Sequence, residues 1–135
     1  MVNFRLISGD TADGTVKAVR QIINDERVQV KAVENNGWDP SPVSTTGSPA
    51  YASLEKTINQ FFDEAVIAPY LMLGASDARY YYNICDSVYR FMPVQLGSKA
   101  LKLIHGIDEH INIADLEKMA QFYASLMQAW GKAEM

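Results

Sequence analysis

The 135-residue chain is poor in the residue types from which metal and redox sites are usually built. It has one cysteine and two histidines, which excludes an internal disulfide and a cysteine-rich zinc site. Cys85 stands among aromatic residues, so we expect a small buried apolar side chain rather than a nucleophile. The chain also lacks a Walker loop and a dinucleotide-binding fingerprint.

Long apolar runs and an excess of basic residues are missing as well. No run approaches the roughly 20 residues of a membrane span, and the first residues lack a signal-peptide pattern. We therefore expect a cytoplasmic protein that contacts no membrane. The net charge of −4 argues against a nucleic-acid partner, because phosphate binding needs clustered Lys and Arg. With 48% hydrophobic and 21% charged residues, the chain is expected to fold around a real core.

The pattern of apolar residues in the first part of the chain predicts a strand, a helix and a second strand. Apolar residues alternate over 2–7 and again over 28–32, which is the pattern of half-buried strands. Between them, Asp10 or Thr11 is placed to cap a helix. The helix has its apolar residues on one face between positions 16 and 23, and this face is expected to pack inward.

A loop and a second helix follow. Residues 35–49 are dense in Pro, Gly, Ser and Thr, which is typical of a loop or a crossing between domains. Ser48 and Pro49 form a favourable helix start, with Ser at the cap and Pro at the first helical position. The predicted inward side chains of this helix are Leu54, Ile58, Phe61 and Phe62.

The sequence of the C-terminal half predicts an α/β layer. Residues 65–73 are almost continuously apolar and predict a buried strand. A short helix over 78–84 and a strand over 88–94 follow. The last helix is predicted to begin near Asn112. Its inward side chains are expected to be Leu116, Met119, Tyr123, Leu126 and Trp130.

Three places carry residues suited to binding an acidic group. Asn3 and Arg5 fall on one face of the first predicted strand, where they could bind a carboxylate or form an exposed polar face. Gly74-Ala75-Ser76-Asp77 stands between a predicted strand and a helix, where backbone N–H groups can attract an anion. The simpler interpretation is a turn capped by Ser or Asp. Arg79 lies in the first helical turn, where the helix dipole opposes a cation. Its partner could be a ligand carboxylate, Asp77 or Asp86.

The segment 103–112 holds both histidines and two adjacent carboxylates. His105 is suited to zinc as a neutral imidazole, and Asp108, Glu109 and His110 could add ligands. A capping or packing histidine is the alternative. The rest of the chain offers too few ligands to complete a zinc site.

Six short segments follow one another in an order that resembles one protein family. They are Asn3-Phe4-Arg5, Gly9-Asp10-Thr11, Asp39-Pro40-Ser41-Pro42-Val43-Ser44, Gly74-Ala75-Ser76-Asp77-Ala78-Arg79, Val88-Tyr89-Arg90-Phe91 and Ile104-His105-Gly106-Ile107-Asp108-Glu109. Together they resemble the carboxypeptidase S branch of the zinc peptidases that include acetylornithine deacetylase and succinyl-diaminopimelate desuccinylase. The resemblance extends over nearly the whole chain, although no single motif would suffice.

The resemblance implies an α/β fold that is part of a larger protein. In the family, an α/β catalytic domain is interrupted by an α+β lid or dimerisation domain. Residues 1–36 would be the strand-helix-strand end of the lid, and residues 37–135 the C-terminal part of the catalytic domain. The part that carries the His-X-Asp pair, the bridging Asp and the Glu-Glu pair with the general base would be absent.

The resemblance also assigns roles. His105 is similar to the family's last zinc ligand, in a site that binds two zinc ions. Asn3 and Arg5 match lid residues that hold the substrate carboxylate, and Gly74, Ser76 and Arg79 match the loop that lines the substrate pocket. Relatives often have Gly-Gly-Thr or Gly-Asn-Thr at residues 74–76, and Asn-Glu where this chain has Asp108-Glu109. No catalytic residue is expected in this chain, and zinc would bind to it weakly or not at all.

Three functions remain open at this point. The first is a fragment, inactive alone, of a zinc carboxypeptidase or amidohydrolase that cleaves peptides or N-acyl amino acids. The second is a non-catalytic association module, which forms a homodimer through residues 1–36 or complements a separate N-terminal half, because an unpaired sheet edge invites pairing. The third is an α/β binding domain that holds a carboxylate with Arg5 and Arg79.

Overall fold

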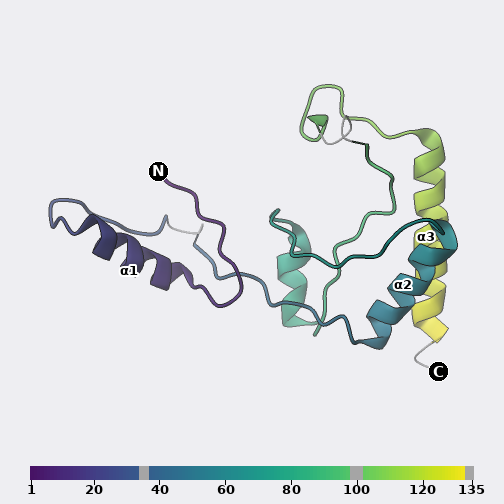
Figure 1. Cartoon of the computed structure of the whole chain (residues 1–135), viewed down its shortest axis with the longest axis horizontal. Helices are drawn as coiled ribbons and strands as arrows, with labels where there is room; N and C mark the ends of the chain where they lie inside the picture. The colour runs from purple at the N-terminus through teal and green to yellow at the C-terminus, as the bar shows by residue number, and fades with distance from the viewer. Residues whose placement is uncertain (34–36, 98–101, 133–135) are drawn as a thin grey trace. The chain divides into compact units, whose positions relative to one another are not determined.

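The computed structural model describes residues 1–33, 37–97 and 102–132. Its helices are α1 (Ala12–Ile23), α2 (Pro49–Phe61), the 3₁₀ helix η1 (Asp77–Asn83) and α3 (Ile113–Lys132) (Figure 1). The chain divides into two compact units. Unit 1 comprises Met1–Ser44 and Leu71–Val88, and unit 2 comprises Thr45–Tyr70 and Tyr89–Met135. The predicted boundary between residues 36 and 37 borders residues that are not described, and it stays a prediction.

No β-strand is present among the described residues. The segments 2–7, 28–32, 65–73 and 88–94, each predicted as a strand, run without helical or strand structure. A strand exists only through backbone hydrogen bonds to a neighbouring strand, and these segments form no such ladder with one another. The α/β class and the strand-helix-strand lid remnant are therefore not confirmed. Apolar alternation marks a segment that suits a sheet, but it does not supply the partner strand.

Local signals set the ends of α1. The Thr11 hydroxyl accepts the backbone N–H of Gly14 at 3.0 Å, so Thr11 rather than Asp10 is the N-cap. At the other end Asn24 adopts a left-handed conformation with φ 44°, and its N–H donates to the carbonyl of Arg20. The start of this helix agrees with the cap predicted at Asp10 or Thr11.

The apolar face of α1, however, is not covered. The helix buries no residue, and Ile22 keeps 82% of its surface exposed. Val16 and Val19 are only partly buried. The expectation that this face packs inward is wrong for the chain by itself, because α1 buries no residue and both Ile22 and Ile23 stay exposed.

The core of unit 2 lies between α2 and α3, which pack against each other (Figure 1). Ser48 caps α2 by accepting the N–H of Tyr51 at 3.0 Å, and Pro49 occupies the first turn as predicted. The buried core residues are Leu54, Ile58, Phe122 and Leu126, with Phe61, Phe62, Ile67 and Tyr89 partly buried against them.

The buried face of α3 differs from the predicted one by a small rotation. Phe122 is fully buried, whereas Leu116 and Trp130 are 54% and 39% exposed. The ring of Phe122 lies 5.3 Å from the Phe91 ring and 5.6 Å from the Phe61 ring, centroid to centroid. This aromatic cluster selects Phe122 over its neighbour Tyr123. The prediction of a buried Cys85 is also wrong, since Cys85 is exposed.

Candidate functional site

Arg5 connects the start of the chain to the segment that leads into the Gly74 turn. Its Nη1 donates to the backbone carbonyl of Leu73 at 2.8 Å, between positions 68 residues apart in sequence. Both residues are exposed. Arg5 and Gly74 were singled out separately in the sequence, and this hydrogen bond places Arg5 beside the residue that precedes Gly74. Asn3 is exposed and makes no hydrogen bond to another described residue.

The turn at residues 74–77 is open to solvent. Ser76 is the residue before η1, but its side chain makes no capping hydrogen bond. Of the two caps that the simpler interpretation allowed, Ser or Asp, the Ser76 side chain is therefore not one. The Ser76 carbonyl accepts the N–H of Arg79 at 3.4 Å, which is a weak start for a short 3₁₀ helix.

Arg79 lies close to two aromatic rings. Its guanidinium carbon is 4.3 Å from the centroid of the Trp38 ring and 4.7 Å from that of Tyr80. Its Nη2 also donates a hydrogen bond to the Tyr80 hydroxyl at 2.8 Å. Among the described residues Arg79 makes no ion pair, so neither Asp77 nor Asp86 is its partner. Trp38 and Tyr80 were not expected at this site from the sequence, although an aromatic residue directly after an arginine is a usable signal.

His105 belongs to unit 2, in a tight turn. Its φ of 62° is left-handed, a conformation that histidine tolerates better than most residues. The His105 N–H donates to Glu109 Oε2 at 3.1 Å. Gly106 donates to the Leu103 carbonyl at 2.7 Å, and a Cβ on Gly106 would stand only 2.9 Å from that oxygen. The turn therefore requires Gly106 and leaves His105 exposed, so His105 is not a packing histidine.

A hollow of about 80 Å³ lies near this turn but does not include His105. Its walls carry the polar side chains of Gln95, His110, Asn112 and Asp115. Nδ1 of His110 is engaged with the backbone carbonyl of Asp108. The hollow therefore does not join the two histidines into one site.

A complete metal site is not formed by the part of the chain that the structure describes. No group of three or more His, Cys, Asp or Glu side chains there is placed to hold a metal ion. Structural and catalytic zinc sites need three or four protein ligands. His105 can offer one, so these residues do not fit a self-sufficient zinc site. The described helices also include none that is long and apolar enough to span a membrane.

Comparison with known proteins identifies the family. Residues 5–129 match the model of peptidase family M20/M25/M40. The chain is 35% identical over 127 residues to "Probable carboxypeptidase S-like 2" of Dictyostelium discoideum. It is 38% identical over 128 residues to the N-fatty-acyl-amino acid synthase/hydrolase PM20D1 of Xenopus tropicalis. Each alignment covers 94% of this chain, and they cover 24% and 25% of the two relatives.

The chain thus spans about a quarter of the length of these curated relatives. A shorter alignment, 28% identical over 83 residues, relates 56% of the chain to 14% of carboxypeptidase S of Saccharomyces cerevisiae. No solved structure matches the chain. The resemblance drawn from the six sequence segments is confirmed at the level of the family. The chain belongs to peptidase family M20/M25/M40.

Proposed function

We propose that this chain supplies the carboxylate-binding residues and one zinc ligand of a hydrolase that cleaves peptides or N-acyl amino acids, and that it is inactive alone. The observation that carries the proposal is the Arg5–Leu73 hydrogen bond, which places Arg5 beside the turn that leads to Arg79. Arg5 and Arg79 lie in unit 1, and neither forms an ion pair with a described residue.

The chemistry of arginine supports a carboxylate as the bound group. A guanidinium offers five N–H donors in a planar fork that matches a carboxylate. One matched relative is named a carboxypeptidase and another an N-fatty-acyl-amino acid synthase/hydrolase. Both names describe an amide bond next to the carboxylate of an amino acid. We therefore assign Asn3, Arg5, Gly74, Ser76 and Arg79 to the substrate side of the site.

Most of the ligands of the metal would come from outside the described residues. His105 is proposed as one ligand, because it is exposed and its turn is fixed by Gly106. When bound, zinc polarises the amide carbonyl and activates water. The described residues include no group of three or more His, Cys, Asp or Glu side chains placed to hold a metal ion, so the hydrolytic step would need residues from the rest of the enzyme.

We also propose that these residues form part of an α/β fold in a longer protein. In the longer protein we expect residues 2–7, 28–32, 65–73 and 88–94 to pair with further strands and form an α/β fold. Residues 1–36 would then end a lid domain, and residues 37–135 would end a catalytic domain. The uncovered apolar face of α1 supports this, because that face is available to pack against a neighbouring segment.

A chimera tests the proposal. The matching quarter of the Dictyostelium relative is replaced by this chain, and hydrolysis of N-acetyl-leucine and of a dipeptide is measured with zinc present. We expect an active chimera, and a loss of at least about a hundredfold in the His105→Ala and Arg79→Ala chimeras. The chain alone, assayed with zinc, should show no activity.

Replacement of His110 by Ala is the matched control, since it removes the second histidine and should leave most activity. Full activity of the His105→Ala chimera would refute the role of His105 as a ligand. Metal-dependent hydrolysis by the isolated chain would refute its proposed inactivity.

The alternative is self-association through residues 1–36, of which 34–36 are not described. The exposed Ile22 and Ile23 on α1 favour it. Light scattering after size-exclusion chromatography shows whether the chain is a dimer or a monomer. A dimer that becomes a monomer in the Ile22→Lys variant would support association, and a monomeric wild-type chain would contradict it.

A further inference from the structure

The environment of Arg79 is unusual for a structural arginine. An arginine that only stabilises a fold usually directs its donors at a carboxylate or a backbone carbonyl. Here the contacts are the Trp38 ring, the Tyr80 ring and one hydrogen bond to the Tyr80 hydroxyl. All three residues belong to unit 1.

Ring contacts and hydrogen bonds use different parts of the guanidinium. Cation–π attraction acts through the face of the aromatic ring, and a guanidinium stacked on that face keeps its N–H donors pointing outward in its own plane. Trp38 can therefore hold the face of Arg79 without consuming a donor. Tyr80 takes one of the five donors through its hydroxyl. The remaining edge keeps the fork geometry that binds a carboxylate.

We propose that Trp38 is a positioning residue, which holds Arg79 with its donor edge directed at the carboxylate of the substrate. This inference rests on the proposed function of Arg79. An arginine side chain loses much rotamer freedom when it binds, and a residue that restricts it beforehand lowers that cost. Because Trp38 is 50% exposed, the gain expected from a partly exposed cation–π contact is about threefold to tenfold in affinity.

The first arm of the test needs no ligand. In the 135-residue chain with ¹³C-labelled arginine, the Trp38 ring current should move the Arg79 δ-CH₂ signal to lower chemical shift. The Trp38→Ala variant should move the signal towards the ordinary arginine shift, leaving only the displacement that the Tyr80 ring causes, and Trp38→Phe should retain more of the displacement. Far-UV circular dichroism checks that each variant keeps its helices.

The second arm titrates N-acetyl-leucine and follows the same signal. Trp38→Ala should weaken binding by about threefold to tenfold, while Trp38→Phe should restore most of the affinity. Arg79→Lys keeps the charge but loses the planar fork, so it should bind more weakly than Trp38→Ala. Because this variant lacks the Arg79 signal, its affinity is compared with that of the wild type and of Trp38→Ala by isothermal titration calorimetry. N-acetyl-leucinamide lacks the carboxylate and is the control ligand, for which no saturable shift is expected.

The outcomes separate this inference from the proposed function. An ordinary Arg79 shift in the wild-type chain would overturn the positioning role of Trp38. The positioning role would also be overturned if the wild type and Trp38→Ala bound N-acetyl-leucine with equal affinity while Arg79→Lys bound it weakly. The carboxylate site at Arg79 would then still be supported. An intact ring-current shift without saturable binding by the wild-type chain would overturn both the positioning role and the carboxylate site.

Discussion

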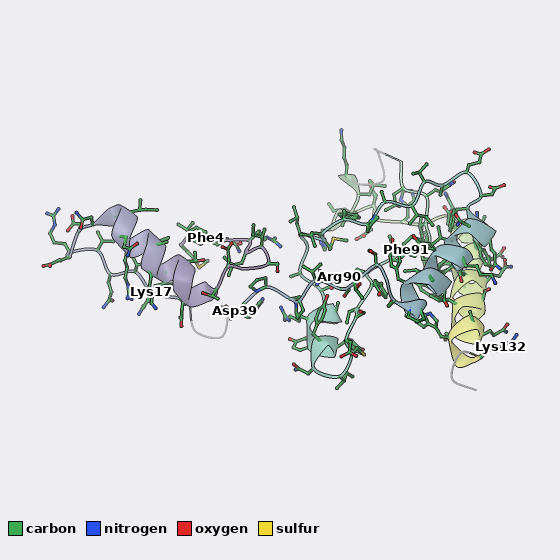
Figure 2. All side chains as sticks on the ribbon, turned by 60° about the horizontal axis from the view of Figure 1, so that its bottom comes forward. Phe4, Lys17, Asp39, Arg90, Phe91 and Lys132 are labelled. Carbon is green, nitrogen blue, oxygen red and sulfur yellow. The ribbon has the colours of Figure 1, made fainter. Side chains whose placement is uncertain are left out.

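Asp39 accepts the backbone N–H of Ala12 through Oδ1 at 2.8 Å, from a position 27 residues further along the chain. Figure 2 shows Asp39 beside the end of α1 at which the helix begins. Together with the Thr11 cap, this carboxylate satisfies two of the N–H groups that the first helical turn leaves without a partner. A negative charge at this end also complements the helix dipole. The segment that follows residue 37 is thereby attached to α1 within unit 1.

We therefore expect Asp39→Ala to destabilise α1. Loss of a capping acceptor costs about 1 kcal/mol, which corresponds to about fivefold faster amide exchange in the helix. Hydrogen exchange followed by NMR measures this directly. Asp86→Ala is the matched control, because Asp86 is an exposed carboxylate of unit 1 with no hydrogen bond to a described residue. Equal exchange rates in the two variants would contradict the capping role.

Arg5→Gln should loosen the segment before Gly74. The substitution removes the charged donor to the Leu73 carbonyl, an exposed hydrogen bond whose loss costs about 1 kcal/mol. Limited proteolysis should then cut within residues 71–76 several times faster. Lys17→Gln removes one positive charge from α1 in the same unit, and it should leave the cutting rate unchanged. If both variants are cut at the wild-type rate, the hydrogen bond does not order this segment.

Phe122→Ala should be the most damaging single substitution in unit 2. The side chain is fully buried in the aromatic cluster with Phe61, Phe62 and Phe91. Truncating a buried Phe costs about 3–5 kcal/mol, which is a large share of the stability of a small domain. Urea unfolding measures the change. Met127→Ala, on the same helix but 64% exposed, should cost less than about 1 kcal/mol.

Some features could be predicted from the sequence because they are local. The caps of α1 and α2 depend on Thr11 and Ser48, which contact backbone groups only three residues away. Strands differ because their hydrogen bonds come from other segments, and the described residues supply none. The rotated face of α3 has a similar cause, since Phe122 is selected by rings on other segments.

For the candidate site, too, single positions could be predicted from the sequence, whereas the contacts between distant segments could not. The resemblance to the family singled out Arg5, Arg79 and His105 as individual positions. The sequence did not indicate that Arg5 bonds Leu73 or that Trp38 covers Arg79, because these contacts join segments far apart in the chain. Among the described residues no group of three or more His, Cys, Asp or Glu side chains is placed to hold a metal ion, and the incomplete zinc site expected around His105 stays a prediction.

The stability of unit 2 should fall at alkaline pH through Tyr123. Burial raises the pKa of the Tyr123 hydroxyl above its ordinary value of 10.0, and this hydroxyl donates to the Phe91 carbonyl at 3.0 Å. The unfolded chain then releases the proton at a lower pH than the folded chain. The stabilisation is fully present below pH 10.0 and is lost as the pH rises through the folded-state pKa.

Urea midpoints measured from neutral pH to above pH 10 check this prediction against Tyr123→Phe, which has no proton to lose. The stability advantage of the wild type should shrink with rising pH, by a small amount because Tyr123 is still 37% exposed. Tyr80→Phe is the control, since Tyr80 is 62% exposed and belongs to unit 1. Its curve should run parallel to that of the wild type. A Tyr123→Phe curve that is also parallel would show that this hydroxyl does not control the alkaline transition.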